Sequence, residues 1–268
     1  MKTESIKECV KAKRDDIEQI LRESGELLKN RKMAEKVREK GFADYVTEVD
    51  VTVQQYMKQR LQEMFPQIAF MGEENETKKI EEENCIWVLD PVDGTTNLIH
   101  DYHHSAISLA LVEKRVVVFG MIYDPYREEV FFAMEKEGAF LNEKPICIRV
   151  PQKMEDSLIA VGTSPYYHEE AEKNFKIFEK VFRECQDIRR SGSAALDLAW
   201  TACGRVDAYF ERHLKVWDYA AGEIIVREAG GVVRNYKGED ATIETEEDII
   251  AGSAWLAEEL QIKYLNAE

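Results

Sequence analysis

The sequence lacks the long apolar runs and paired cysteines that mark several classes of protein. No stretch approaches the ~20 consecutive apolar residues of a transmembrane helix, and the opening residues, MKTESIKECVKAKRDD, contain no apolar core of a signal peptide. The five cysteines are odd in number, scattered and never spaced as C-x-x-C, which argues against a disulfide framework and a structural zinc site. We therefore expect a cytoplasmic protein with no membrane partner.

Basic residues are scarce relative to acidic ones. The chain has 36 lysines and arginines against 52 aspartates and glutamates, a formal net charge of −16 at pH 7. A surface of this sign repels the backbone of nucleic acids and anionic membranes, so we expect no nucleic-acid partner. It also repels small phosphorylated molecules. A phosphate site in this chain would therefore need local cations, and bound metal ions are the natural source near carboxylates.

The length of 268 residues allows one large domain or two modest ones. A composition shift near Pro151 predicts an N-terminal α+β domain, residues 1–150, and a C-terminal α/β domain, residues 151–268. In the first, residues 1 to about 40 have the apolar spacing of helices, and residues 105–141 contain strand-like runs that predict an antiparallel meander. In the second, predicted strands and helices alternate.

The chain is organised around the string Asp90-Pro91-Val92-Asp93-Gly94-Thr95-Thr96-Asn97. The apolar run before it, residues 86–89, predicts a buried strand that ends at Asp90-Pro91, because proline cannot donate to a sheet ladder. Asp90 and Asp93 then offer hard oxygen ligands for a divalent cation. The turn that follows could open a helix and direct backbone N–H groups at an anion. The alternative is a capped turn in which Asp93 merely accepts backbone hydrogen bonds.

Other acidic side chains lie at the ends of predicted elements. Glu73 follows a short strand, Asp50 precedes a helix, and Asp218 lies at the start of another helix. Taken singly, these residues are a solvated loop charge, an N-cap and a favourable charge at a helix N-terminus. If they converge with Asp90 and Asp93, their mutual repulsion would require bound cations.

A loop of small residues, Gly192-Ser193-Ala194, opens a further predicted helix. Glycine there would let the backbone approach a ligand closely, and it would equally allow tight packing of the helix. The sequence by itself favours neither explanation. Glu211 ends a predicted strand further along the chain.

Four strings together resemble the inositol monophosphatase family of magnesium-dependent, lithium-sensitive sugar phosphatases. Their order and spacing agree along essentially the whole chain. The strings that begin at Asp90 and at Trp217 form a highly specific pair. The resemblance implies a layered αβαβα sandwich of the carbohydrate phosphatase type, with α+β and α/β portions. The strings are Thr47-x-x-Asp50, Gly72-Glu73-Glu74, Asp90-Pro91-Val92-Asp93-Gly94-Thr95-Thr96-Asn97 and Trp217-Asp218-Tyr219-Ala220-Ala221-Gly222.

The resemblance implies a set of magnesium ligands. Glu73, Asp90 and the backbone carbonyl of Val92 would hold one ion. Asp90, Asp93 and Asp218 would hold a second, and a third ion could be recruited through Glu73. Val92, Asp93 and Asp218 would border the substrate as well. The cofactor is then two or three Mg²⁺ ions.

The resemblance also implies catalytic and substrate-binding roles. Thr95, oriented by Asp50, would act with Glu73 to position and deprotonate the attacking water, and Asp93 would support the same chemistry. The amides of Gly94 and Thr95 would bind phosphate oxygens. The reaction would be an in-line attack by activated water, with no phosphoenzyme. The resemblance also implies the contacts with the sugar. Gly192, Ser193 and Ala194 would form the loop that contacts it, and Glu211 would accept hydrogen bonds from inositol hydroxyls.

The implied function is hydrolysis of myo-inositol monophosphate to inositol and phosphate. The expected binding partner is thus a small phosphorylated polyol or sugar, and the expected assembly is a homodimer. Within the same chemistry, the alternatives are fructose 1,6-bisphosphate, 3′-phosphoadenosine nucleotides and histidinol phosphate. From a different class, the alternative is a non-catalytic interaction protein that uses this fold to dock to another macromolecule. The matching acidic residues and Thr95 are all present, which argues against a pure loss of activity.

Overall fold

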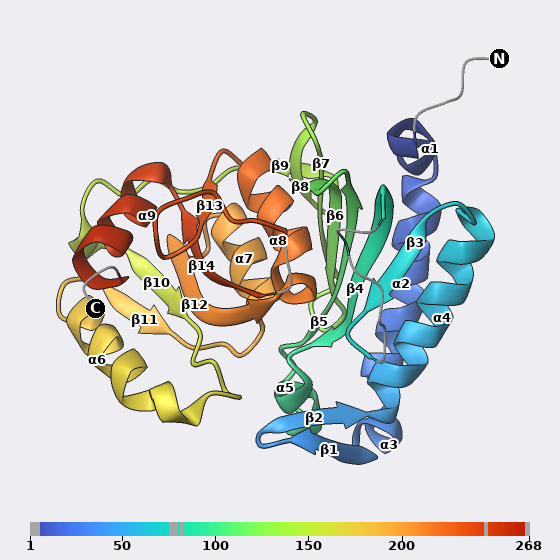
Figure 1. The fold of residues 1–268 in the computed structure, drawn as a ribbon, viewed down its shortest axis with the longest axis horizontal. Coiled ribbons are helices and arrows are strands. Elements are labelled where there is room, and N and C mark those ends of the chain that lie inside the picture. The colour runs from blue at the N-terminus through green and yellow to red at the C-terminus, as the bar shows by residue number, and fades with distance from the viewer. Residues whose placement is uncertain (1–5, 75–79, 81–82, 244–245, 266–268) are drawn as a thin grey trace.

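The computed structural model describes residues 6–74, 80, 83–243 and 246–265, which form five alternating layers of helices and sheets (Figure 1). The layers run helices, seven-stranded sheet, helices, five-stranded sheet, helices. This arrangement confirms the predicted αβαβα sandwich. Among the described residues, no helix is both long and apolar enough to cross a membrane.

The larger sheet is built almost entirely from consecutive antiparallel neighbours, as the meander pattern predicted. Its strand order follows the chain, and only the first pair is parallel. The strands are β3 (Ala69–Gly72), β4 (Cys85–Asp93), β5 (Ala106–Glu113), β6 (Val116–Asp124), β7 (Glu129–Met134), β8 (Gly138–Leu141) and β9 (Lys144–Ile146).

The smaller sheet has the order β11-β10-β12-β14-β13 and mixes parallel and antiparallel pairs. Its position after the meander matches the predicted change in character of the chain. The division into two domains stays a prediction. The strands are β10 (Leu158–Val161), β11 (Asp187–Arg189), β12 (Ala208–Lys215), β13 (Val232–Arg234) and β14 (Glu246–Gly252).

Helices cover both sheets and fill the space between them. The outer helices on the larger sheet are α1 (Ile6–Ala12), α2 (Arg14–Leu28) and α4 (Glu48–Met64), and the middle layer is α7 (Ala194–Ala202) and α8 (Val216–Glu228). The outer helices on the smaller sheet are α6 (Ala171–Phe182), α9 (Ala254–Leu260) and a π-helix, Gln261–Leu265. Short helical segments are α3 (Arg31–Ala34), α5 (Thr95–Ile99), η2 (Met154–Asp156) and η3 (His168–Glu170).

The middle layer packs closely because glycine stands where helix and strand meet. A Cβ at Gly120 of β6 would lie 2.6 Å from the carbonyl oxygen of Ala221 in α8. A Cβ at Gly222 would lie 2.5 Å from the Leu198 side chain of α7. Any larger residue would push these elements apart, and interiors packed at crystal density tolerate little such change. The close packing keeps the start of α8, which carries Asp218, against the larger sheet.

The N-terminal segment differs from the prediction at one point. Residues 31–40 are dense in charge and are followed by Gly41, a pattern that predicts a fraying helix end or a mobile loop. Only Arg31–Ala34 is helical, and β1 (Val37–Gly41) pairs with β2 (Asp44–Thr47) as a two-stranded antiparallel ribbon. The charged segment of β1 is almost wholly exposed, so it shows no apolar alternation from which a strand could be predicted. The predicted helix from residue 51 begins earlier, at Glu48.

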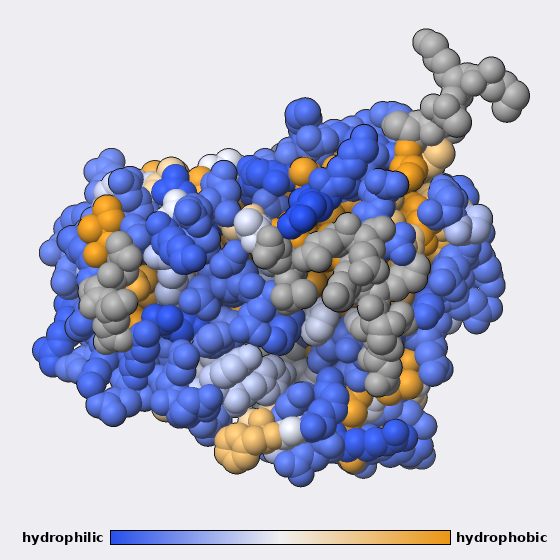
Figure 2. All heavy atoms as spheres, in the orientation of Figure 1, coloured by the Kyte–Doolittle hydropathy of each residue, from blue (hydrophilic) through white to orange (hydrophobic). Residues whose placement is uncertain are grey.

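Residues 77–84, TKKIEEEN, have the composition of a charged linker, and most of them lie outside the described residues. The visible face of the molecule in Figure 2 is mainly hydrophilic, as a net charge of −16 requires. Some apolar atoms are exposed at the free end of the β1–β2 ribbon, where Phe42 is 70% exposed.

Candidate active site

The central string lies at the end of β4, which is buried along its whole length. The strand does not end at Asp90-Pro91 as predicted, because pairing with β5 resumes at Asp93 after a shift of register. The irregularity accommodates Pro91, whose missing N–H is not needed there. Asp90 Oδ1 accepts a hydrogen bond from the Val92 N–H at 2.9 Å. Gly94 then adopts φ +92° and α5 begins at Thr95, as the predicted turn requires.

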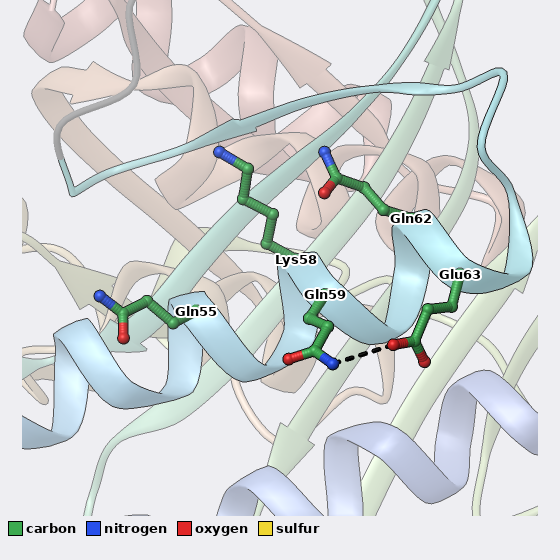
Figure 3. Close-up of a pocket in the computed structure, with 5 residues that line it drawn as sticks. All are labelled: Gln55, Lys58, Gln59, Gln62 and Glu63. Atoms are coloured by element: carbon green, nitrogen blue, oxygen red, sulfur yellow. Dashed lines mark hydrogen bonds between the residues drawn. The ribbon is translucent and has the colours of Figure 1, made fainter.

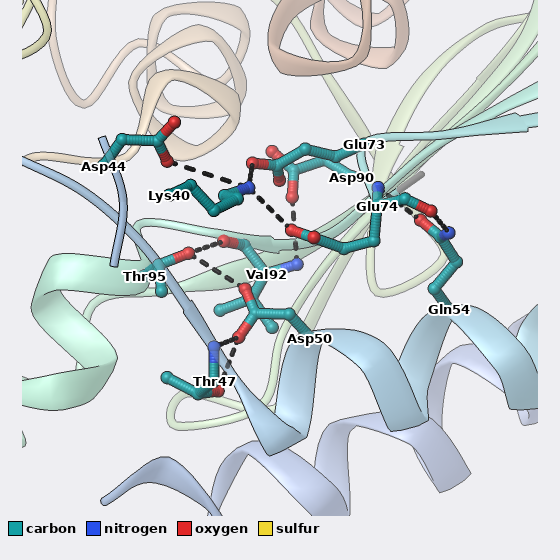
Figure 4. Close-up of polar contacts among 10 residues, drawn as sticks. All are labelled: Lys40, Asp44, Thr47, Asp50, Gln54, Glu73, Glu74, Asp90, Val92 and Thr95. Carbon is teal, nitrogen blue, oxygen red and sulfur yellow. Dashed lines mark hydrogen bonds and ion pairs between the residues drawn. The ribbon is translucent and has the colours of Figure 1, made fainter. Parts of the chain in front are cut away.

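Thr95 and Asp50 form a hydrogen-bonded pair beside β4 (Figure 4). The Thr95 hydroxyl lies 3.0 Å from Asp50 Oδ1 and 3.1 Å from the Val92 carbonyl oxygen. Asp50 is buried, and its other oxygen accepts the Thr47 N–H at 2.8 Å. Burial raises the pKa of Asp50, and the hydrogen bonds from Thr47 and Thr95 oppose that rise.

Of the two interpretations of Asp50, the one that makes it the N-cap of its helix does not hold. Thr47 is the N-cap of α4, and Asp50 is the acidic partner of a capping box one turn further on. The same carboxylate therefore closes the helix end with one oxygen and holds Thr95 with the other. Asp50 thus supports the start of α4 as the capping-box residue, although not as the N-cap, and it also orients Thr95.

The acidic pair at the end of β3 is held by a lysine that sequence reasoning had not placed in contact with it. Lys40 Nζ of β1 lies 3.0 Å from Glu73 Oε1, 2.8 Å from Glu74 Oε1 and 3.7 Å from Asp44 Oδ1 (Figure 4). Burial raises the pKa of Glu73 to about 7, although Lys40 opposes the shift. Gln54 hydrogen-bonds both the N–H and the carbonyl of Glu74, which fixes this turn against α4.

Asp93 receives the N-terminal end of α7. The Ser193 hydroxyl donates to Asp93 Oδ2, which also accepts the Ala195 N–H at 2.8 Å, while the Ala194 N–H lies 3.3 Å from Oδ1. Burial is the main reason that the pKa of Asp93 rises to about 6. The structure therefore brings the predicted Gly192–Ala194 loop onto the central string. Gly192 adopts φ +88°, and a Cβ there would lie 2.4 Å from Arg190 Nη1.

Asp218 completes a group that we call the acidic cluster, defined as Glu73, Asp90, Asp93 and Asp218. Asp218 lies in the first turn of α8 and accepts the Lys215 N–H at 2.7 Å. Burial and the charges of Glu73, Asp93 and Asp218 raise the pKa of Asp90, and burial with Asp93 and Glu73 raises that of Asp218. The four carboxylates thus lie close enough to repel one another, as predicted for residues that converge on one site.

Glu211 lies on β12 near this cluster, and its charge contributes to the raised pKa of Asp93. The Tyr209 hydroxyl donates to its Oε2 at 2.5 Å and the Ser164 N–H to its Oε1 at 2.8 Å. A Cβ on Gly162 would lie 1.9 Å from Oε2, so glycine makes room for the carboxylate. The sequence offered no signal for Tyr209 and Ser164 beyond their nearness to predicted strand ends.

The oxygen-rich donor set fits magnesium, which prefers hard ligands. Within the described ranges, no three His, Cys, Asp or Glu side chains are arranged to hold a metal ion as they stand. The protein's own donors engage these carboxylates instead: Lys40 at Glu73, Ser193 at Asp93, and the Lys215 N–H at Asp218. Buried carboxylates with raised pKa values are the groups that a divalent cation would relieve. The assignment of individual ligands stays a prediction.

A separate hollow of about 390 Å³ lies on the exposed face of α4 and contains none of the predicted site residues (Figure 3). Polar side chains line it, and Gln59 Nε2 donates to Glu63 Oε1 at 2.9 Å. The lining residues are Gln55, Lys58, Gln59, Gln62 and Glu63.

The fold and the site define an αβαβα sandwich of the sugar phosphatase type. The sequence model of the inositol monophosphatase family matches residues 2–268, and the chain belongs to that family of magnesium-dependent phosphomonoesterases.

Relatives and solved structures support the same membership. Nus factor SuhB of Xylella fastidiosa is 39% identical over 230 residues, which cover 84% of this chain and 83% of the relative. Inositol-1-monophosphatase of Rhizobium meliloti is 36% identical over 222 residues, which cover 83% of each. The crystal structure of extragenic suppressor protein SuhB from Bartonella henselae matches with a TM-score of 0.89 and 32% identity, covering 96% of this chain and 100% of that one.

Proposed function

We propose that this chain is a magnesium-dependent phosphomonoesterase that releases phosphate from a small phosphorylated polyol or sugar, with myo-inositol monophosphate as the leading substrate. The observation that carries the proposal is the Thr95–Asp50 pair beside the buried acidic cluster. A proton acceptor next to carboxylates of raised pKa is the kind of arrangement found at catalytic sites.

The chain's own residues would activate and orient water. A hydroxyl has one hydrogen, and Thr95 donates it toward Asp50 or the Val92 carbonyl, so its oxygen remains free to accept a hydrogen bond from water. The Glu73 carboxylate would act with Thr95 as the acceptor for the proton that this water releases. Together these groups would hold a water molecule and receive its proton.

The predicted magnesium ligands are Glu73, Asp90 and the Val92 carbonyl for one ion and Asp90, Asp93 and Asp218 for a second. When bound, magnesium supplies Lewis-acid chemistry and neutralises phosphate charge. Binding at Glu73 would require the Lys40 ammonium to move or share the carboxylate, because it now lies 3.0 Å from Oε1.

The remaining predicted residues would bind the substrate. The backbone N–H groups of Gly94 and Thr95 would donate hydrogen bonds to phosphate oxygens where β4 passes into α5. Glu211 and the Gly192-Ser193-Ala194 loop would hold the leaving group. The hydrogen bond from the Ser193 hydroxyl to Asp93 and the effect of the Glu211 charge on the pKa of Asp93 support this assignment. A homodimer remains our expectation for the assembly.

A second candidate function comes from the comparisons. Several similar proteins are named Nus factor SuhB, a name that denotes a factor rather than a phosphatase. These names weaken the narrow assignment to inositol monophosphate and favour the alternatives of another small phosphorylated substrate or an interaction protein on this fold. The two roles are compatible in one chain.

The first experiment measures phosphate release from a panel of esters with magnesium and with EDTA. The panel is myo-inositol 1-phosphate, fructose 1,6-bisphosphate, 3′-phosphoadenosine 5′-phosphate and histidinol phosphate. We expect magnesium-dependent release, fastest from the inositol ester. Preference for another ester would keep the site and replace the substrate, and no release from any would refute the phosphatase proposal.

The second candidate is tested in cells from which the native chain has been removed. Asp93→Asn is introduced in place of the wild type, with an empty vector as the matched control. If the cellular defect is repaired by the variant, the required role does not depend on hydrolysis, and the interaction function is favoured. Repair by the wild type alone favours the enzyme.

A further inference from the structure

Asn97, the last residue of the central string, bridges two segments that lie far apart in the chain. Its side chain is buried on α5, and Nδ2 donates to the His104 carbonyl at 2.7 Å and to the Ser191 carbonyl at 3.0 Å. Carbonyl oxygens only accept hydrogen bonds, so the NH2 end of the amide must face both of them. The two hydrogens of this group are therefore both used by the backbone.

Ser191 begins a segment that we call the leaving-group loop, defined as residues 191–194. It contains the residues proposed to hold the leaving group, and it passes into α7 at Ala194. Asn97 borders this loop closely, because a Cβ on Gly192 would lie 3.1 Å from Asn97 Nδ2 and 3.2 Å from its Oδ1. The amide thus contacts the backbone of the loop as well as holding its first carbonyl.

Asn97 is joined equally closely to the proposed phosphate-binding turn, Gly94 and Thr95. It lies on the same short helix as Thr95. The His104 carbonyl that Asn97 holds lies beside Gly94, where a Cβ would be 3.1 Å from that oxygen. The Ser105 hydroxyl also donates to the Gly94 carbonyl at 2.9 Å. The turn is therefore fixed to residues 104–105 and, through Asn97, to the leaving-group loop.

Two further hydrogen bonds hold the leaving-group loop, and they differ from the Asn97 contact in kind. The Ser191 hydroxyl donates to Asp197 Oδ2 at 2.6 Å, but Asp197 lies on α7 and would move with the loop. The Ser193 hydroxyl donates to Asp93, which is a predicted magnesium ligand. Asn97, in contrast, ties the loop to the phosphate side through groups that are not predicted ligands.

We propose that Asn97 is a positioning residue that fixes the alignment of the leaving-group loop with the phosphate-binding turn. The inference rests on the proposed phosphatase function. In-line attack requires the water, the phosphorus and the leaving oxygen to keep one geometry, and small misplacements lower the rate steeply. An ester whose leaving group is held by the loop depends on this alignment. An ester whose leaving group makes no polar contact with the loop does not.

The test compares the wild type with Asn97→Ala and Asn97→Ser on two esters, myo-inositol 1-phosphate and p-nitrophenyl phosphate. Inositol is a poor leaving group with hydroxyls that the loop can bind, whereas p-nitrophenolate is a good leaving group and carries no hydroxyl. Asn97→Ala removes the donor of both carbonyls. We expect it to lower kcat/KM for the inositol ester by about a hundredfold, mainly through kcat, as a displacement of about 1 Å can do.

The p-nitrophenyl ester should be affected little by either variant, so the ratio of the two kcat/KM values reports the alignment. Asn97→Ser keeps one hydroxyl donor and should give a ratio between those of Asn97→Ala and the wild type. If Asn97→Ala does not fold, the ratio in Asn97→Ser decides the inference. A purely structural role would lower both rates together and leave the ratio unchanged.

Asn235→Ala is the matched control, because Asn235 is also a buried asparagine that holds backbone groups. Its Oδ1 accepts the Lys237 N–H at 3.0 Å and the Glu239 N–H at 3.1 Å, in the turn after the edge strand β13. The control variant should lower the melting temperature and leave the ratio of the two esters at the wild-type value.

Hydrogen exchange of peptides that cover residues 191–194 measures the loop without reference to activity. Faster exchange in Asn97→Ala and not in Asn235→Ala, together with a loss confined to the inositol ester, supports the inference. Unchanged exchange, or equal losses on both esters, overturns it while wild-type phosphate release keeps the proposed function. If the wild type releases no phosphate from either ester, the proposed function fails and the inference fails with it.

Discussion

The contact of Lys40 with Glu73 and Glu74 gives a prediction with a calculable size. Replacing Lys40 by methionine keeps much of the side chain and removes the ammonium, which lies 3.0 Å and 2.8 Å from the two carboxylates. The Glu73 and Glu74 side chains are 17% and 6% exposed, so the change would leave buried negative charge without its partner. Breaking a fully buried pair costs about 3–5 kcal/mol and an exposed one about 0–1 kcal/mol.

Because Lys40 itself is 28% exposed, an intermediate loss of about 1–3 kcal/mol in the free energy of unfolding is expected without metal. Chemical denaturation in EDTA measures it. The matched control is Lys36→Met on the same segment, whose ammonium pairs with Glu48 at 2.6 Å but is 64% exposed. That change should cost less than about 1 kcal/mol, as surface pairs do.

Magnesium should reduce the difference in stability between Lys40→Met and the wild type. The ammonium and a divalent cation compete for the Glu73 carboxylate, so Lys40→Met should bind magnesium more tightly than the wild type in a calorimetric titration. Added magnesium should then restore most of the lost stability. Equal stability of Lys40→Met and wild type in EDTA would refute the electrostatic account of this contact. Unchanged magnesium affinity would refute the proposed ligand role of Glu73.

Three further predictions concern the acidic cluster. Asp93→Asn should lower turnover by orders of magnitude while its circular dichroism spectrum matches the wild type, and near-normal phosphate release would contradict the ligand assignment. Lithium at millimolar concentration should inhibit phosphate release by occupying the second metal position, and complete insensitivity would point to an altered site. The metal-free protein should melt at higher temperature at pH 5.5 than at pH 7.5, because folding raises the pKa of Glu73 to about 7 and of Asp93 to about 6. Between those pH values the folded state binds more protons than the unfolded state, so stability falls as pH rises. Magnesium should flatten this dependence, and a melting temperature that rises with pH in EDTA would show that the carboxylates are not destabilised as described.

Much of the site could be predicted because several of its functional residues lie close together in short stretches of sequence. The run from Asp90 to Asn97 carries two carboxylates, a left-handed turn at Gly94 and a helix start within eight residues, and each of these is set by local backbone rules. Strands of the larger sheet could also be predicted from the sequence, since buried β5 and β6 are nearly continuous apolar runs joined by a short turn.

Local rules failed where a neighbour distant in the chain supplied the deciding contact. β1 is charged and exposed, so its pairing with β2 leaves no periodic trace, and the sequence could not show that Lys40 would reach Glu73. Pro91 predicted the end of a strand because proline has no N–H to donate to a sheet. The strand nevertheless resumes its pairing at Asp93 after a shift of register. The N-cap interpretation of Asp50 did not hold, because only the structure shows that Thr47 is the N-cap of α4.

The sequence by itself therefore determined which acidic residues, turns and strands this protein has, because those depend on residues a few positions apart. Only the tertiary structure decided what each functional group faces. Asp93 accepts a hydrogen bond from Ser193 at the start of α7, 100 residues further along the chain, and Glu211 accepts one from Ser164, 47 residues before it. Such contacts follow from how the layers pack, and the free energy of packing is shared among residues that no local pattern connects.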